Sequence, residues 1–294
     1  MKVEQRSFPN GVGGRSREED LARARAALST VAPRLIGLIR AARHPEAVAV
    51  GDWRVSDVAA HLSYAAAGEL MVARAAAEGS TEGLDVGEDI VAGVASFNAS
   101  ALEAEPERNT SVLADRIEKT VADFLATTET LRGDEPSGWL GGVLLPTSAL
   151  ACHLLEEFLI HGFDIAQAER SPWPIDSSHA ALGFGFLLDY MKLCDPPTRR
   201  SFVNQQAAAG VKASYELRLR GEGRAFLSFE NGNVEISYDP NSNIDCHVSG
   251  EPMAMMLSAF GRMSQTRAAL TGRITRWGRK PWLAFRLNDL LRNP

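Results

Sequence analysis

The chain has 294 residues, of which 45% are hydrophobic and 23% are charged, and its formal net charge at pH 7 is −6. This balance disfavours a nucleic-acid-binding protein, and the apolar runs are too short to cross a membrane. The length exceeds the usual size of a single domain, so we expect two domains.

The amino-terminal residues 1–17 contain no apolar segment of the kind found in signal peptides, and they predict a flexible leader. The three cysteines, Cys152, Cys194 and Cys246, are far apart and show no Cys-x-x-Cys spacing. This spacing argues against a disulfide framework or a thiolate zinc site and favours buried thiols in a cytoplasmic protein.

Residues 18–195 show the 3.6-residue periodicity of amphipathic helices. Helices are predicted at about 18–42, 55–78, 110–131, 147–169 and 176–193, and an apolar stretch lies at about 90–102. The Gly-rich segment 138–145 is expected to be a loop. Long helices joined by loops favour a helical bundle, and bundles build metal sites from inward-facing side chains of neighbouring helices.

After Asp195-Pro196-Pro197 the periodicity changes from helical to alternating, so this segment is the predicted linker. Asn231-Gly232 predicts a two-residue hairpin between strands at 225–230 and 233–238. Further strands are predicted at 215–220, 244–248 and 274–277, and helices at 252–260 and 282–291. We therefore expect an α+β protein with a helical bundle over 18–195 and a smaller α/β domain over 196–294.

The strongest chemical signal lies in the apolar helix that contains Glu157 and His161. Residues four apart project side by side from a helix, so this pair can reach one ion. Catalytic zinc sites take three protein ligands, and His61, in the apolar run Val58–Leu62, is the best third candidate. A lone apolar-face histidine is more often a core residue, but a buried carboxylate without a partner is costly. The set therefore predicts a metal site.

The segment from Trp53 to His61, Trp-x-Val-x-Asp-Val-Ala-Ala-His, and the later Glu157-x-x-x-His161-Gly-Phe-Asp164 resemble the mycothiol-dependent maleylpyruvate isomerase family. The amino-terminal domain of that family is a DinB-like metal-binding four-helix bundle. The segments 235–245, 248–252 and 272–284 look like the sterol-carrier-like domain that accompanies it. The resemblance covers nearly the whole chain after residue 17 and implies the ligands His61, Glu157 and His161.

Three further residues lie one turn from the predicted ligands and are candidates for supporting roles. His153 lies outside the ligand pattern, one turn before Glu157, and is expected to support that residue or to stand near the substrate. Asp57 and Asp164 are placed to orient the two imidazoles or to contact the cofactor, with helix capping or surface exposure as the alternative.

The implied activity needs a divalent metal such as Zn²⁺ and mycothiol as the thiol cofactor. A thiol that binds the ion loses its proton and becomes a nucleophile for a small electrophile, as an isomerase or an S-transferase. The carboxy-terminal region is rich in arginine. Its basic run is usually a solvated surface, and the sharper hypothesis is that Arg273 and Arg276 bind a substrate carboxylate. A monomer or weak dimer without nucleic-acid or membrane partners is expected.

Two other functions stay open at this level. In a metal-dependent hydrolase the ion would activate water instead of a thiol. In a non-enzymatic carrier the carboxy-terminal domain would hold an apolar ligand against the methionines at 253, 255, 256 and 263, which are otherwise core residues.

Overall fold

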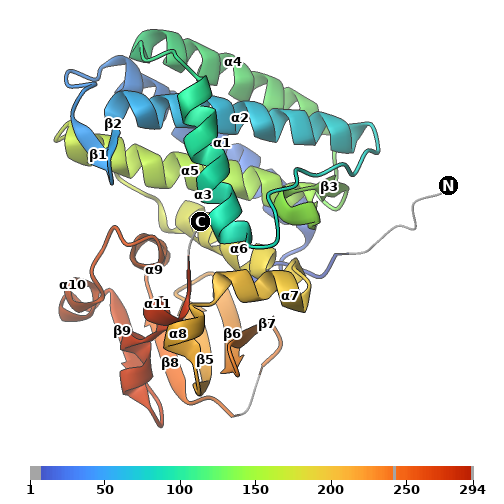
Figure 1. The fold of residues 1–294 in the computed structure, drawn as a ribbon, viewed down its shortest axis with the longest axis vertical. Coiled ribbons are helices and arrows are strands. Elements are labelled where there is room, and N and C mark those ends of the chain that lie inside the picture. Colours follow the sequence, from blue (N-terminus) through green and yellow to red (C-terminus); the bar gives the residue numbers. More distant parts are fainter. Residues whose placement is uncertain (1–7, 241–242, 293–294) are drawn as a thin grey trace. The chain divides into compact units, whose positions relative to one another are not determined.

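The computed structural model describes residues 8–240 and 243–292, and its α-carbon contacts divide the chain into two compact units (Figure 1). Of the described residues, the first unit contains 8–9, 17–85 and 96–175. The second unit contains residues 10–16, 86–95, 176–240 and 243–292. Helix α3 (Ile90–Ala104) belongs in part to each.

The first unit is a four-helix bundle. Its long helices are α1 (Arg17–Arg40), α2 (Val55–Ala77), α4 (Thr110–Thr127) and α5 (Thr147–Ala168). Helices α1 and α2 each pack against both α4 and α5, which closes the bundle around one core. The side chains of Leu28, Leu62, Phe124 and Phe158 are fully buried there.

Two short hairpins lead into the helices that carry the predicted ligands. Strand β1 (Val48–Val50) pairs with β2 (Trp53–Arg54), which continues into α2. Strand β3 (Pro136–Gly138) pairs with β4 (Leu144–Pro146), which continues into α5. The expectation of a plain loop at 138–145 was therefore wrong at its ends, because strands of three residues with Gly and Pro show no alternating pattern.

The second unit contains a five-stranded mixed sheet in the order β7-β6-β5-β8-β9 within residues 212–240 and 243–277. Its strands are β5 (Lys212–Leu219), β6 (Gly223–Glu230), β7 (Asn233–Ser237), β8 (Cys246–Gly250) and β9 (Ile274–Trp277). Strands β5 and β8 are parallel, and the other neighbours are antiparallel. Strand β9, predicted at 274–277, lies at one edge of the sheet.

The predicted hairpin joins β6 and β7 at Asn231 and Gly232, whose φ angles are 52° and 71°. Two consecutive positive φ angles are those of a type I′ turn, which Asn-Gly favours. Helices α6 (Ser177–Leu193) and α9 (Pro252–Ala259) pack together in this unit. The shorter helices are α7 (Pro196–Arg199), α8 (Gln205–Ala208), α10 (Gln265–Leu270) and α11 (Leu287–Leu290).

The α+β class is confirmed, but contacts divide the chain at 175/176 and not at the predicted linker. Helix α6 packs on α9 and contacts β7, although its sequence has the same helical pattern as the bundle helices. Periodicity alone does not show which neighbour a helix packs against. The boundary at 195/196 stays a prediction about which parts fold independently.

Part of the predicted leader is ordered in the second unit, while residues 1–7 lie outside the described residues. Val12 is buried beside Gly185 of α6, and Arg15 Nη1 donates to the Glu222 carbonyl at 3.2 Å. The three cysteines are buried free thiols. Within residues 8–240 and 243–292, the helices fall short of the length and apolar character that a membrane span requires.

Candidate metal centre

The first turn of α2 fixes the position of His61. The Arg54 amide donates to Asp57 Oδ2 at 2.9 Å, and Arg108 Nε donates to Asp57 Oδ1 at 2.7 Å. Asp57 thus caps the helix that carries His61. Its hydrogen bonds go to Arg54 and Arg108 and not to the imidazole, so the capping alternative describes this residue better than the orienting role.

The turn of α5 that carries His161 is held by an aromatic ring. A Cβ atom on Gly162 would lie 2.3 Å from the ring of Trp173, so only glycine permits this approach. Trp173 Nε1 donates to the Leu159 carbonyl at 3.0 Å. The glycine next to His161 therefore has a packing role in this turn.

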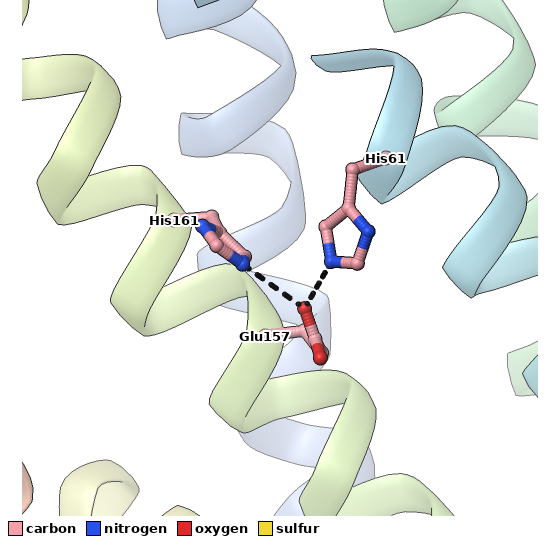
Figure 2. Close-up of side chains that lie close together, drawn as sticks. All are labelled: His61, Glu157 and His161. Carbon is pink, nitrogen blue, oxygen red and sulfur yellow. Dashed lines mark hydrogen bonds and ion pairs between the residues drawn. The ribbon is translucent and has the colours of Figure 1, made fainter. Parts of the chain in front are cut away.

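The three predicted ligands converge on one point between α2 and α5 (Figure 2). His61 Nε2 lies 2.9 Å from Glu157 Oε2, and His161 Nε2 lies 3.4 Å from the same oxygen. Donor atoms of all three lie within 4.8 Å of one another. Two donors that share an ion at about 2.1 Å, with an angle between 90° and 109°, lie about 3.0–3.4 Å apart. The two distances to Oε2 are close to this range, and the shorter one is also a hydrogen-bond distance, so the three residues could hold an ion.

The far nitrogen of each imidazole has a partner of its own. His61 Nδ1 lies 2.6 Å from the Tyr64 hydroxyl, which donates onward to the Asn98 carbonyl at 3.3 Å. His161 Nδ1 lies 3.1 Å from Asp164 Oδ2, an acceptor. With a proton on each Nδ1, these contacts are satisfied and both Nε2 lone pairs face Glu157; with its proton on Nε2, His61 instead donates to Glu157 Oε2 at 2.9 Å. In the first arrangement three acceptor atoms face one another, and a cation would stabilise them.

The second oxygen of Glu157 faces another histidine. His153 Nε2 lies 3.3 Å from Glu157 Oε1, and His153 Nδ1 hydrogen-bonds to Oε1 of Glu69 from α2. Glu69 is 1% exposed, and its Oε2 has no hydrogen-bond partner among the described residues. Sequence analysis missed Glu69. The available signal was a single carboxylate in the otherwise apolar segment 65–73.

The electrostatics of the site suit a metal. Burial lowers the pKa of His61, which is therefore neutral at pH 7, as a ligand must be. Burial by itself would raise the pKa of Glu157, but the surrounding imidazoles hold it well below its usual value. Burial also opposes charge on His153, yet the carboxylates of Glu69 and Glu157 raise its pKa well above the ordinary value. Burial raises the pKa of Glu69.

Aromatic rings line the histidines. The Trp53 ring lies 5.1 Å from that of His61 and 6.5 Å from that of His161. Trp139 meets His153 edge-on, with ring centroids 5.0 Å apart. These rings restrict the orientations of the imidazoles and limit the approach of water.

The two predicted substrate-binding arginines belong to the second unit. Arg276 is in β9, and its guanidinium lies 3.6 Å from the centroid of the Phe285 ring. Arg273 precedes β9 and is 3.9 Å from the Glu251 carboxylate. Their role towards a substrate stays a prediction.

Comparison with known proteins identifies both parts of the chain. Residues 24–166 match the model of the mycothiol maleylpyruvate isomerase N-terminal domain, and residues 198–278 match that of the SCP-2 sterol transfer family. The amino-terminal part of the chain belongs with the mycothiol maleylpyruvate isomerase N-terminal domains, and the carboxy-terminal part belongs with the SCP-2 sterol transfer family. The matched region, residues 24–166, contains His61, Glu157 and His161, the residues that converge in Figure 2.

Solved structures from the mycothiol-dependent maleylpyruvate isomerase family share the fold. A crystal structure of the mycothiol-dependent maleylpyruvate isomerase is 18% identical, with a TM-score of 0.51. A histidine-to-alanine mutant of such an isomerase is 17% identical, with a TM-score of 0.54. Each comparison covers 89% of this chain and 92% of the other. Among curated protein sequences, none matches this chain.

Proposed function

We propose that the chain is a metal-dependent enzyme that uses mycothiol to process a small electrophile, by isomerisation or by S-transfer. The observation that carries the proposal is the convergence of the His61 and His161 Nε2 atoms on one oxygen of Glu157, within the matched amino-terminal domain. Two neutral imidazoles and a carboxylate suit Zn²⁺ or a similar divalent ion and leave coordination positions open.

A divalent ion at this site would supply the positive charge that lowers the pKa of a bound thiol, which is about 8.5 when free. The chain's own residues prepare the site for it. Burial keeps His61 neutral, Tyr64 and Asp164 direct the Nε2 atoms inward, and Glu157 stays ionised. The site thus combines ligands that need no deprotonation with aromatic walls.

The reaction class supported best is reversible thiol addition to a conjugated double bond, as maleylpyruvate-type isomerisation requires. Addition converts the double bond to a single bond, rotation follows, and loss of the thiol restores the double bond without net oxidation. In an S-transferase the adduct would be the product. Arg273 and Arg276, as planar donors, would bind a carboxylate of an anionic substrate.

The proposal is tested by metal analysis and spectroscopy of the purified protein. We expect about one divalent ion per chain. With Co²⁺ in place of Zn²⁺, added mycothiol should produce a sulfur-to-metal charge-transfer band. His161→Ala should abolish the band, and His44→Ala, at an exposed histidine, should preserve it.

Turnover of electrophile by the metal-loaded protein in the complete absence of thiol would contradict the thiol mechanism. It would favour the water-activating hydrolase.

A second candidate function concerns the second unit, where an apolar pocket favours a carrier role. The pocket has a volume of about 80 Å³ and is bordered by α6, α9 and the sheet, with Leu217, Val248 and Met255 among its lining residues. Ligand sites usually measure roughly 300–1,000 Å³, so the pocket would have to widen for a sterol-sized ligand. Retention of an apolar ligand after removal of metal with a chelator would support this candidate.

A further inference from the structure

We propose that Glu69 and His153 are positioning residues that hold Oε1 of Glu157, so that this carboxylate offers a single oxygen, Oε2, to the ion. The inference rests on the proposed metal site and concerns how its carboxylate ligand binds. Neither residue is assigned a role as a ligand.

The two oxygens of Glu157 have different partners. Oε2 faces His61 and His161, while Oε1 faces His153 at 3.3 Å. Among the described residues, these three imidazoles are the ion-pair partners of Glu157. A carboxylate with both oxygens free can bind an ion through both. One whose second oxygen accepts a hydrogen bond is directed towards binding through one.

His153 is held between two acceptors. Its Nδ1 bonds to Glu69 and its Nε2 faces Oε1 of Glu157, so both ring nitrogens are engaged with carboxylate oxygens. His61 and His161 differ from it, because their Nε2 atoms share the other oxygen of Glu157, Oε2.

Glu69 is a rigid support for this ring. It is buried, lies on α2, and connects that helix to His153 on α5. Trp139 packs edge-on against the same imidazole. The position of Oε1 is therefore set by both of the helices that carry the ligands. A carboxylate that binds through one oxygen leaves one more position open for a thiol.

The test uses two substitutions of His153, each of which retains one of its two contacts. In His153→Gln the amide nitrogen replaces Nε2 and can donate to Glu157. In His153→Asn the shorter amide replaces Nδ1 and retains only the contact with Glu69. A packing role predicts that the Asn variant resembles wild type, whereas the proposed role predicts that the Gln variant does.

The readouts are the visible spectrum of the Co²⁺-substituted protein and the zinc dissociation constant. In His153→Asn and His153→Ala we expect one ion per chain, zinc binding weakened about 10–100-fold, and weaker d–d bands because the coordination number rises. His153→Gln should keep the wild-type spectrum and lose no more than a few-fold in zinc affinity, the loss that we assign to the missing contact with Glu69. His247→Ala is the matched control, because it breaks a similar buried pair with Glu216 in the second unit.

The outcomes separate this inference from the proposed function. Absence of metal binding by the wild-type protein would overturn the proposed function itself. Wild-type spectra and affinities in both the Asn and the Ala variants would overturn the inference and leave the metal site standing. Two ions in wild type and one in His153→Ala would also overturn it, because His153 would then be a ligand in the second donor group, with Glu156 and Glu157.

Discussion

Each unit of the molecule contains a buried glutamate that bonds to the Nδ1 atom of a histidine. In the first unit the pair is Glu69 and His153, and in the second it is Glu216 and His247. The two glutamates are 1% and 2% exposed. The pairs differ in what surrounds them.

Glu216 is neutralised by arginines. Arg218 lies 2.8 Å from its Oε2, and Arg224 lies 3.3 Å from its Oε1. In the first unit the next partner of the histidine is a second carboxylate, Glu157, which faces two more imidazoles. Imidazoles have no permanent charge, so this cluster can take up a cation where the arginine-rich cluster is already balanced. The same pair is therefore structural in one setting and supports a candidate metal site in the other.

Of the changes that distinguish the two clusters, removal of a predicted metal ligand should have the largest effect. In His61→Ala or His161→Ala, we expect zinc affinity to fall more than about 100-fold, beyond the loss typical of outer partners. Activity should fall with it, while circular dichroism shows a folded bundle. Competition with a chromophoric chelator measures the affinity, and His247→Ala should retain wild-type binding. Equal zinc affinity in both ligand variants and wild type would refute the ligand assignment.

Disruption of the arginine-balanced cluster should affect stability instead of metal binding. Glu216→Ala leaves Arg218 and Arg224 without their carboxylate, and we expect the free energy of unfolding to fall by about 1–3 kcal/mol. Urea denaturation followed by circular dichroism measures this loss. Zinc affinity should not change. A loss of zinc from this variant would show that the two clusters are not independent.

The spacing of residues in the sequence identified part of the site but not all of it. Glu157 and His161 lie four residues apart on one helix, so local geometry alone brings them together. The link from Glu69 to His153 joins residues 84 positions apart in the sequence, and helix periodicity does not show such pairing. From the sequence, two roles for Asp57, in the first turn of α2, had equal weight, and its hydrogen bonds with Arg54 and Arg108 favour the capping role.

The same limit applies to the fold. The Asn231-Gly232 turn follows from local residue types. The assignment of α6 to the second unit depends on long-range packing against α9, which no local pattern encodes.

The smallest effects should be opposite pH dependences of stability in the metal-free protein. Burial would raise the pKa of Glu216, but hydrogen bonds from Arg218 and His247 lower it below 4.5. The contribution of Glu216 to the free energy of unfolding is present above pH 4.5 and is lost as the pH falls through its folded-state pKa. Burial raises the pKa of Glu69 above 4.5, so stability associated with this residue is lost as the pH rises through its folded-state pKa.

Denaturation at several pH values measures these effects. For Glu216→Gln, the free energy of unfolding should fall less steeply than in wild type as the pH is lowered. For Glu69→Gln, the free energy of unfolding should decline less than in wild type as the pH rises towards neutral. Identical pH profiles for both variants and wild type would remove the electrostatic distinction between the two glutamates.

The most direct test of the central claim is the zinc content of wild type, His61→Ala and His247→Ala after saturation with zinc and removal of excess by gel filtration. Elemental analysis should give about one ion per chain for wild type and His247→Ala, and almost none for His61→Ala. Equal zinc content in His61→Ala and wild type, or no zinc in the wild-type protein, would contradict the claim that His61, Glu157 and His161 form a metal site.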